Sequence, residues 1–176
     1  MHIFSALSPI ALLAPALAAC IGAAPAESPP ERVTVERTSL TPERRGQALL
    51  QKVMLDRHNK TRAKIGARPL IWNAALTKDA RAYARQMART GKFAHDPQTG
   101  KSPRQGENLW MGTFEAYSYT EMVNGWIDED RFFQSGIFPN NSTTGKWSDV
   151  GHYTQIIWPT TTHVGCALAS NARDDY

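Results

Sequence analysis

The chain has 176 residues, of which 41% are hydrophobic, and this length supports one compact domain with extensions. Its formal net charge of +4 is modest, and the arginines that recur at helical spacing (Arg81, Arg85, Arg89) have no aromatic residues between them to stack on bases. The composition therefore argues against a nucleic-acid partner. It still allows loose contact with anionic polymers of a cell envelope.

The N-terminal segment is typical of an export signal. Residues 1–19 contain no Lys, Arg, Asp or Glu, and their apolar stretch, interrupted by Pro15, is too short to span a membrane. We therefore predict a signal peptide over residues 1–19. Leu17-Ala18-Ala19-Cys20 has the form of a bacterial lipobox, in which Cys20 would carry the lipid anchor. The alternative is cleavage near Ala18 or Ala24, which would release a soluble secreted protein.

Residues 20–41 are rich in Ala, Pro and charged residues without an apolar period, and this pattern predicts a linker before a folded domain over residues 42–176. A first helix is expected from Thr41-Pro42-Glu43 to about Lys64, ended by Gly66. A second helix is expected from Asn73 to Gly91. The first helix would bury Leu50, Met54, His58 and Ile65, and the second Leu76, Ala80, Tyr83, Ala84 and Met87.

The second half of the chain predicts one more helix and two strands. A helix is expected over Ser118–Phe133, and strands over His152–Trp158 and His163–Ala169, which would form a hairpin around Pro159. Helices early in the chain and late strands with two apolar faces predict a sheet that is covered by helices on both sides.

Four ionisable side chains lie among residues with the character of a core. Glu129 falls in the apolar seam of the third predicted helix, where a carboxylate needs a hydrogen bond, a cation or a metal, or else caps a nearby loop. His152 opens a buried strand, His95 follows the second helix in a polar loop, and Glu107 follows Gly106 in another loop. A hydrogen bond within the core or the loop is the structural alternative for the two histidines, and the position of Glu107 by itself indicates little.

Other polar and aromatic residues favour structural roles. His58 and Arg62 lie one turn apart on the first helix, where a packed, hydrogen-bonded histidine is expected. Tyr153 and Gln155 would face away from His152 on its strand. Three tryptophans are candidates for a groove, although core positions are the base expectation: Trp110, Trp147 and Trp158.

Several motifs, taken in order, closely resemble the CAP superfamily, also called SCP/PR-1-like, which includes cysteine-rich secretory proteins, venom antigen 5 and plant pathogenesis-related proteins, with many bacterial relatives. The matching segments lie between about Gln47 and Ala169: HNKTR (58–62), PLIW (69–72), FAHD (93–96), GENL (106–109), WIDE (126–129), GHYTQIIW (151–158) and VGCA (164–167).

The resemblance implies an α+β fold, a three-layer α–β–α sandwich with a small central, largely antiparallel sheet. Relatives often follow VGCA with one more strand that carries a second cysteine, and this chain stops at residues 174–176, where that strand would begin. We therefore expect a C-terminally short domain that lacks its last strand. Two cysteines would allow one disulfide, but a lipidated Cys20 would leave Cys166 without a partner.

The resemblance also implies that His95, Glu107, Glu129 and His152 converge in one cleft that binds a divalent metal. Two imidazoles and two carboxylates suit Zn²⁺ best, and Mg²⁺ or Ca²⁺ is the alternative. The leading hypothesis is an exported binding module, lipid-anchored in a bacterial envelope or secreted, with a small hydrophobic or envelope ligand. One alternative is a metal-dependent hydrolase with Glu107 or Glu129 as general base, although HExxH, GxSxG and CxxC are all absent. The other is a structural envelope domain with a vestigial site.

Overall fold

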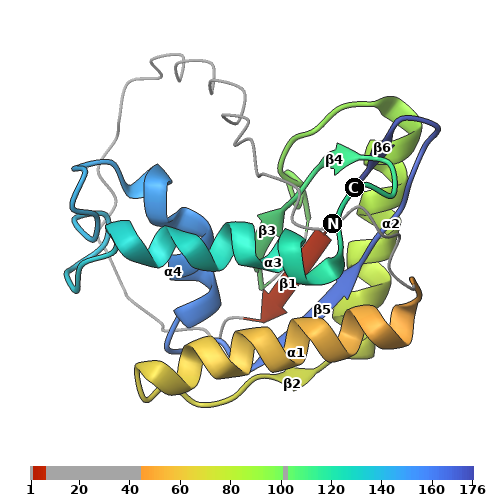
Figure 1. Ribbon diagram of the computed structural model, residues 1–176. Helices are drawn as coiled ribbons and strands as arrows, with labels where there is room; N and C mark the ends of the chain where they lie inside the picture. Colours follow the sequence, from red (N-terminus) through yellow and green to blue (C-terminus); the bar gives the residue numbers. More distant parts are fainter. Residues whose placement is uncertain (1, 7–44, 101–102) are drawn as a thin grey trace.

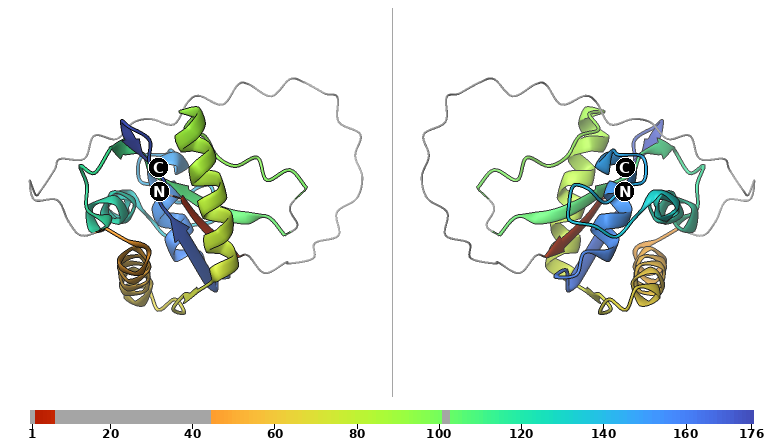
Figure 2. Two further views of the ribbon diagram at one scale, coloured as in Figure 1. Left: turned by 90° about the vertical axis from the view of Figure 1, so that its right-hand side faces the viewer. Right: turned by 90° about the vertical axis from the view of Figure 1, so that its left-hand side faces the viewer.

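The computed structural model describes residues 2–6, 45–100 and 103–176. A central sheet has α2 on one face and α1, α3 and α4 on the other, which gives three layers (Figures 1 and 2). This arrangement confirms the predicted α+β sandwich. No helix in the described ranges is long and apolar enough to cross a membrane.

The sheet has four strands in the order β2-β5-β1-β3, followed by a separate two-stranded sheet of β4 and β6. β1 runs antiparallel to both neighbours, and only β2 and β5 pair in parallel, so the sheet is largely antiparallel as predicted. The strands are β1 (His2–Ala6), β2 (Ile71–Trp72), β3 (Gln105–Leu109), β4 (Gly112–Thr113), β5 (His163–Ala167) and β6 (Asp174–Asp175).

The N-terminal strand bears on the predicted signal peptide, because cleavage of that peptide would also remove this strand from the sheet. Residues 2–6 of the predicted signal peptide form β1, which holds the position between β5 and β3. The rest of that segment, the lipobox at residues 17–20 and the linker at 20–41 lie outside the described residues.

The first two helices follow their local signals closely. α1 (Gln47–Lys64) buries Leu50, Met54 and His58 as predicted, while its predicted start at residues 41–43 lies outside the described part. Ile65 is 47% exposed, contrary to the prediction, because it follows the last helical residue. α2 (Ala74–Thr90) has Asn73 as N-cap, and Gly91, at φ 68°, ends it in the left-handed region.

The third helix is shorter than predicted. α3 (Tyr119–Ile127) begins with a capping box between Ser118 and Glu121, and the chain then tightens into the 3₁₀-helix η1 (Asp128–Phe132). Glu129 still lies on the inward side of this segment, as the sequence predicted: its side chain is 18% exposed, while the neighbouring Asp128 and Asp130 are exposed.

The predicted strand over His152–Trp158 is wrong. The segment forms the 3₁₀-helix η2 (Trp147–Val150) followed by α4 (Gly151–Ile157), and no hairpin with β5 exists. The buried residues Tyr153, Ile156 and Ile157 follow helical spacing, so burial against α1 and α3 outweighs the strand preference of β-branched and aromatic residues. The predicted loop at GENL is also wrong, because Glu107 lies on β3.

One arginine fixes α4 against α1. Arg62 is fully buried, and its guanidinium donates hydrogen bonds to four carbonyl oxygens, those of Arg68 (2.6 Å), Ile156 (2.8 Å), Trp158 (2.9 Å) and Thr161 (3.0 Å). The first-helix residues His58 and Arg62 are thus structural, as expected. His58 is 2% exposed, and its Nδ1 hydrogen-bonds the Met54 carbonyl at 2.8 Å.

The far side of β5 packs directly on α2. A Cβ at Gly165 would overlap Leu76 and Thr77, so the close approach of strand and helix requires glycine there. The neighbouring Cys166 is buried in the core, and burial raises the pKa of its thiol to about 12. The thiol is therefore protonated and inert at neutral pH.

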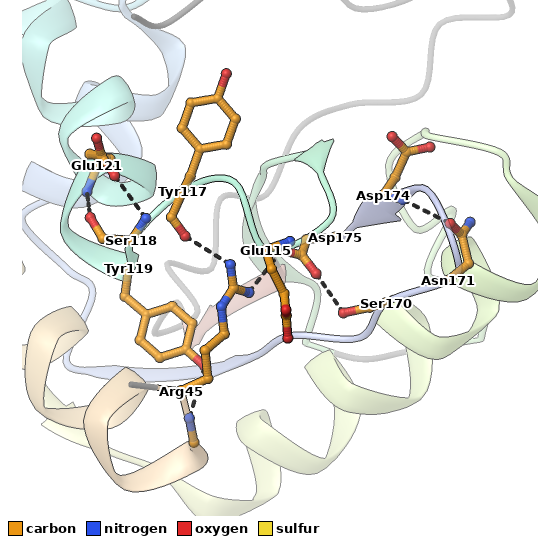
Figure 3. A network of polar contacts seen from close by, with 11 residues as sticks. Arg45, Glu115, Tyr117, Ser118, Tyr119, Glu121, Ser170, Asn171, Asp174 and Asp175 are labelled. Atoms are coloured by element: carbon orange, nitrogen blue, oxygen red, sulfur yellow. Dashed lines mark hydrogen bonds and ion pairs between the residues drawn. The ribbon is translucent and has the colours of Figure 1, made fainter. Parts of the chain in front are cut away.

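The C-terminal residues are tied into the domain by the polar network in Figure 3. The buried carboxylate of Asp175 accepts hydrogen bonds from Arg45 Nη1 (2.7 Å), Ser170 Oγ (2.5 Å) and the backbone N–H of Glu115 (2.9 Å). Arg45 also donates to the Tyr117 carbonyl at 2.9 Å. Tyr176 is 1% exposed, so the last residues of this chain are part of the core.

Candidate functional site

A cleft of about 810 Å³ opens between β3, η1, η2 and α4. All four predicted site residues line it, two from the β3 side and two from the η1–α4 side. The lining comprises His95, Glu107, Asn108, Gly125, Asp128, Glu129, Arg131, Phe132, Phe138, Trp147, Ser148, Asp149, Gly151, His152, Thr154, Gln155 and Trp158.

On the β3 side, Glu107 holds the loop that follows α2. Its side chain is 5% exposed, and Oε1 accepts hydrogen bonds from His95 Nδ1 and from the backbone N–H of Asp96, the latter at 3.1 Å. A third hydrogen bond holds the loop, because the Tyr83 hydroxyl donates to the Ala94 carbonyl at 2.8 Å. Burial, with the carboxylates Glu107 and Asp96 nearby, raises the pKa of Tyr83 to about 12, so this hydroxyl keeps its proton.

On the opposite side, Glu129 holds the start of α4. Its Oε1 lies 2.6 Å from His152 Nδ1, and its Oε2 accepts from the backbone N–H of Tyr153 at 3.0 Å. Because α4 lacks a side-chain cap of its own, Glu129 satisfies one of its free N–H groups and places negative charge at its N-terminus. Glu129 thus has the hydrogen-bond partners that the sequence required of a carboxylate at this position, and it caps α4, not a loop.

The two pairs share one geometry, which we call the His–Glu fork: a carboxylate binds Nδ1 of a histidine and the backbone N–H of the residue after it. The first fork is Glu107 with His95 and Asp96, and the second is Glu129 with His152 and Tyr153. Each fork holds its imidazole at Nδ1 and the chain beside it at one backbone N–H, so Nε2 is the ring nitrogen that can act on a ligand. The Trp126 ring, stacked on His152 at 6.1 Å, further restricts the second imidazole.

An aromatic group forms another part of the lining. Phe138 packs edge-on against Trp147, with ring centroids 5.6 Å apart, and against Trp158, at 6.3 Å. Trp147 and Phe138 are each 51% exposed. The groove expectation therefore holds for Trp147 and Trp158, while Trp110 packs against the hydrophobic core, as the alternative held.

The donor chemistry of the forks bears on metal binding. In the described part of the chain, no three His, Cys, Asp or Glu side chains are placed to hold one metal ion. The four predicted ligands thus do not form a preassembled centre, because each carboxylate binds a histidine. An imidazole held at Nδ1 by a carboxylate is nonetheless a common arrangement for ligation through Nε2, so the chemistry of each fork suits a histidine metal ligand.

Sequence reasoning missed part of the lining. Gln155 lies one helical turn after His152 and on the same side of α4, contrary to the strand-based expectation. Asp128 and Asp149 also line the cleft, and neither was singled out. Asp128 directly precedes Glu129, and Asp149 follows Trp147 by two residues. A prediction that η1 and η2 are turns around a cleft would have found both.

The fold and the cleft define a class of α–β–α sandwich proteins, and comparison of the sequence with known protein families assigns the chain to the same class. The family profile of the cysteine-rich secretory protein family, CAP, matches residues 55–176. The chain belongs to this family.

Named relatives come from plants and animals. Pathogenesis-related protein PR-1 of Medicago truncatula is 35% identical over 109 residues (62% of this chain and 58% of that protein), and pathogenesis-related protein 1A of Nicotiana tabacum is 32% identical over 117 residues (66% and 64%). Human GLIPR1-like protein 1 is 30% identical over 127 residues (65% and 48%). The matches thus span less than two thirds of each relative's length.

Among solved structures, the hookworm platelet inhibitor aligns with a TM-score of 0.50 at 16% identity, covering 76% of this chain and 69% of that one. At this identity the likeness shows the fold alone.

Proposed function

We propose that this protein is an exported binding module whose cleft takes a small, partly apolar ligand, with the two His–Glu forks as its polar end. The observation that carries the proposal is the cleft itself, which both forks and the aromatic group line together. Its volume of about 810 Å³ lies in the range of small-molecule pockets, and apolar walls with a few fixed polar groups are typical of such sites.

The geometry favours binding over hydrolysis. A general base needs a lone pair directed at the proton that it removes. Glu107 and Glu129 each already accept hydrogen bonds from an imidazole and from a backbone N–H. Their arrangement supports orientation of the histidines more than proton transfer.

A divalent ion is part of the proposal. His95 and His152 would hold it through Nε2, with Glu107 and Glu129 as supporting carboxylates, and imidazole ligands favour Zn²⁺ over Mg²⁺ or Ca²⁺. When bound, such an ion supplies a Lewis acid that polarises an oxygen of the ligand.

Replacing either histidine of the forks is expected to weaken zinc binding by at least about tenfold, because a two-imidazole site loses half of its protein ligands. Isothermal titration of wild type, His95→Ala and His152→Ala with Zn²⁺ at pH 7.5 measures this, with the partly buried β5 residue His163→Ala as control. Unchanged affinity in both fork variants would refute the metal site. An apolar ligand should still bind the double variant, since the aromatic wall is intact.

Export and anchoring are also proposed, on the pattern of residues 1–20. If Cys20 carries the lipid, Cys20→Ala should move the protein from the membrane fraction to the soluble fraction of cells that express it, because a lipid chain contributes about 0.8 kcal/mol per buried methylene. Fractionation with detection by immunoblot checks this. Wild-type protein that is already soluble and begins after Ala24 would contradict lipidation and favour secretion.

A further inference from the structure

The cleft differs in charge from the chain that forms it. The chain carries a formal net charge of +4, but the cleft lining has four carboxylates, Glu107, Asp128, Glu129 and Asp149, against one guanidinium, Arg131. Within the described ranges, Asp128 and Asp149 form no salt bridge with a lysine or arginine. A concave surface with this excess of negative charge attracts cations and disfavours anionic ligands.

The same cleft exposes aromatic rings next to those carboxylates. Trp147 and Asp149 share the short helix η2, which packs against η1 with Asp128. Phe138 joins Trp147 and Trp158 edge-on, at interplanar angles of 62° and 76°, so the three rings present differently oriented surfaces around one corner of the cleft. Aromatic faces carry negative electrostatic potential and attract cations that are weakly hydrated.

The lining already contains one contact of this kind. The guanidinium of Arg131 lies 4.8 Å from the centroid of the Phe132 ring, and both residues line the cleft. The single cationic side chain of the lining is thus placed on an aromatic ring. The Phe138–Trp147–Trp158 group has no such cation over it among the contacts of the described residues.

We infer that the cleft binds an alkylated organic ammonium ion, with its charged head at the Phe138–Trp147–Trp158 group and Asp149. An inorganic cation would gain little from three aromatic rings, and a neutral apolar ligand would gain nothing from the negative charge of Asp128 and Asp149. Methylated ammonium groups combine low hydration with positive charge, which is what rings beside carboxylates recognise. This inference rests on the proposed function, since it specifies the ligand of the same cleft.

The test compares probes that share one alkyl chain. Dodecyltrimethylammonium, dodecyl maltoside and dodecyl sulfate are titrated into the protein below their micelle concentrations, and binding is followed by calorimetry. The ammonium should bind at least about tenfold tighter than the maltoside, and the sulfate weakest. Equal binding of ammonium and maltoside would overturn the inference but leave the proposed function standing. Binding of none of the three would overturn both.

Variants locate the head group. Trp147→Leu keeps an apolar side chain but removes the ring, and it should weaken the ammonium probe about tenfold while leaving the maltoside unchanged. Asp149→Asn should act in the same direction. Asp130→Asn is the matched control, because Asp130 lies on η1 but outside the cleft lining. An equal loss in Asp130→Asn, or none in Trp147→Leu, would contradict the assignment.

Two further experiments distinguish a soluble ammonium ligand from a lipid head group. Choline in solution and vesicles of phosphatidylcholine carry the same head group. Competition by choline against the dodecyl probe, without sedimentation of the protein with vesicles, would indicate a soluble ligand. Sedimentation that Trp147→Leu abolishes would indicate a lipid head group. Neither competition nor sedimentation would overturn the assignment of the head group to the aromatic corner.

Discussion

Replacing Arg62 by alanine is expected to remove a large part of the stability of the domain. The variant would leave four buried carbonyl oxygens without their donor and open a cavity between α1 and α4. Loss of one partner from a buried charged network costs about 3–5 kcal/mol, a large share of the roughly 5–15 kcal/mol that stabilises a typical domain. Urea unfolding followed by circular dichroism measures the loss.

Two further variants sharpen this test. Arg62→Lys should recover little, because a single ammonium group cannot reach carbonyls of α4, of the following turn and of the loop after α1 together. Lys64→Ala, two residues on and exposed, should stay within about 0.5 kcal/mol of wild type. If the free energy of unfolding of Arg62→Ala lies within about 1 kcal/mol of the wild-type value, the hydrogen bonds of Arg62 are not what holds α4 in place.

Acid is expected to destabilise the domain through His58. The pKa of His58 is lowered from 6.5 to about 4, chiefly by burial; the hydrogen bond to the Met54 carbonyl opposes this shift, and the nearby charge of Arg62 adds to it. The unfolded chain therefore takes up this proton first as pH falls. The stability that depends on a neutral His58 is fully present above about pH 6.5. It is lost between there and about pH 4, which lowers the free energy of unfolding by about 3 kcal/mol.

The contribution can be isolated with His58→Gln. This variant should be less stable than wild type at pH 7.5, and the gap should shrink by about 2–3 kcal/mol by pH 4, because glutamine takes up no proton. Unfolding free energies from urea titrations at several pH values give the gap. Met54→Leu, on the same helix, loses stability without changing a titrating group, so its gap should not depend on pH. A constant gap for His58→Gln would contradict the assignment.

Elements governed by local signals were predicted well. The bounds of α2 follow from Asn73 and Gly91, and the start of α3 follows from the Ser118–Glu121 capping box, because these residues act within one turn of the backbone. α4 was not predicted, because its β-branched and aromatic residues favour a strand locally. What makes the segment helical is non-local: Arg62 binds carbonyls at its C-terminal end and Glu129 binds its N-terminal end.

The candidate site likewise combines features that the sequence predicts with features that depend on contacts between distant segments. Its four principal residues were named from the resemblance, and the structure brings all four to one cleft. Their pairing into forks depends on how β3 meets the loop after α2 and how η1 meets α4, contacts between segments far apart in the sequence. The acidic character of the cleft was hidden for the same reason, since Asp128 and Asp149 come together only through the packing of η1 on η2.

The central claim is that His95 and His152 act together in one cleft. Long-range ¹H–¹⁵N spectra of the imidazole rings, assigned with single histidine variants and recorded during titration with Zn²⁺, test it most directly. We predict that the Nε2 signals of both residues change together and saturate at one ion per chain, while the signals of the buried His58 stay constant. Changes at only one of the two rings, or confined to other histidines, would contradict a shared site.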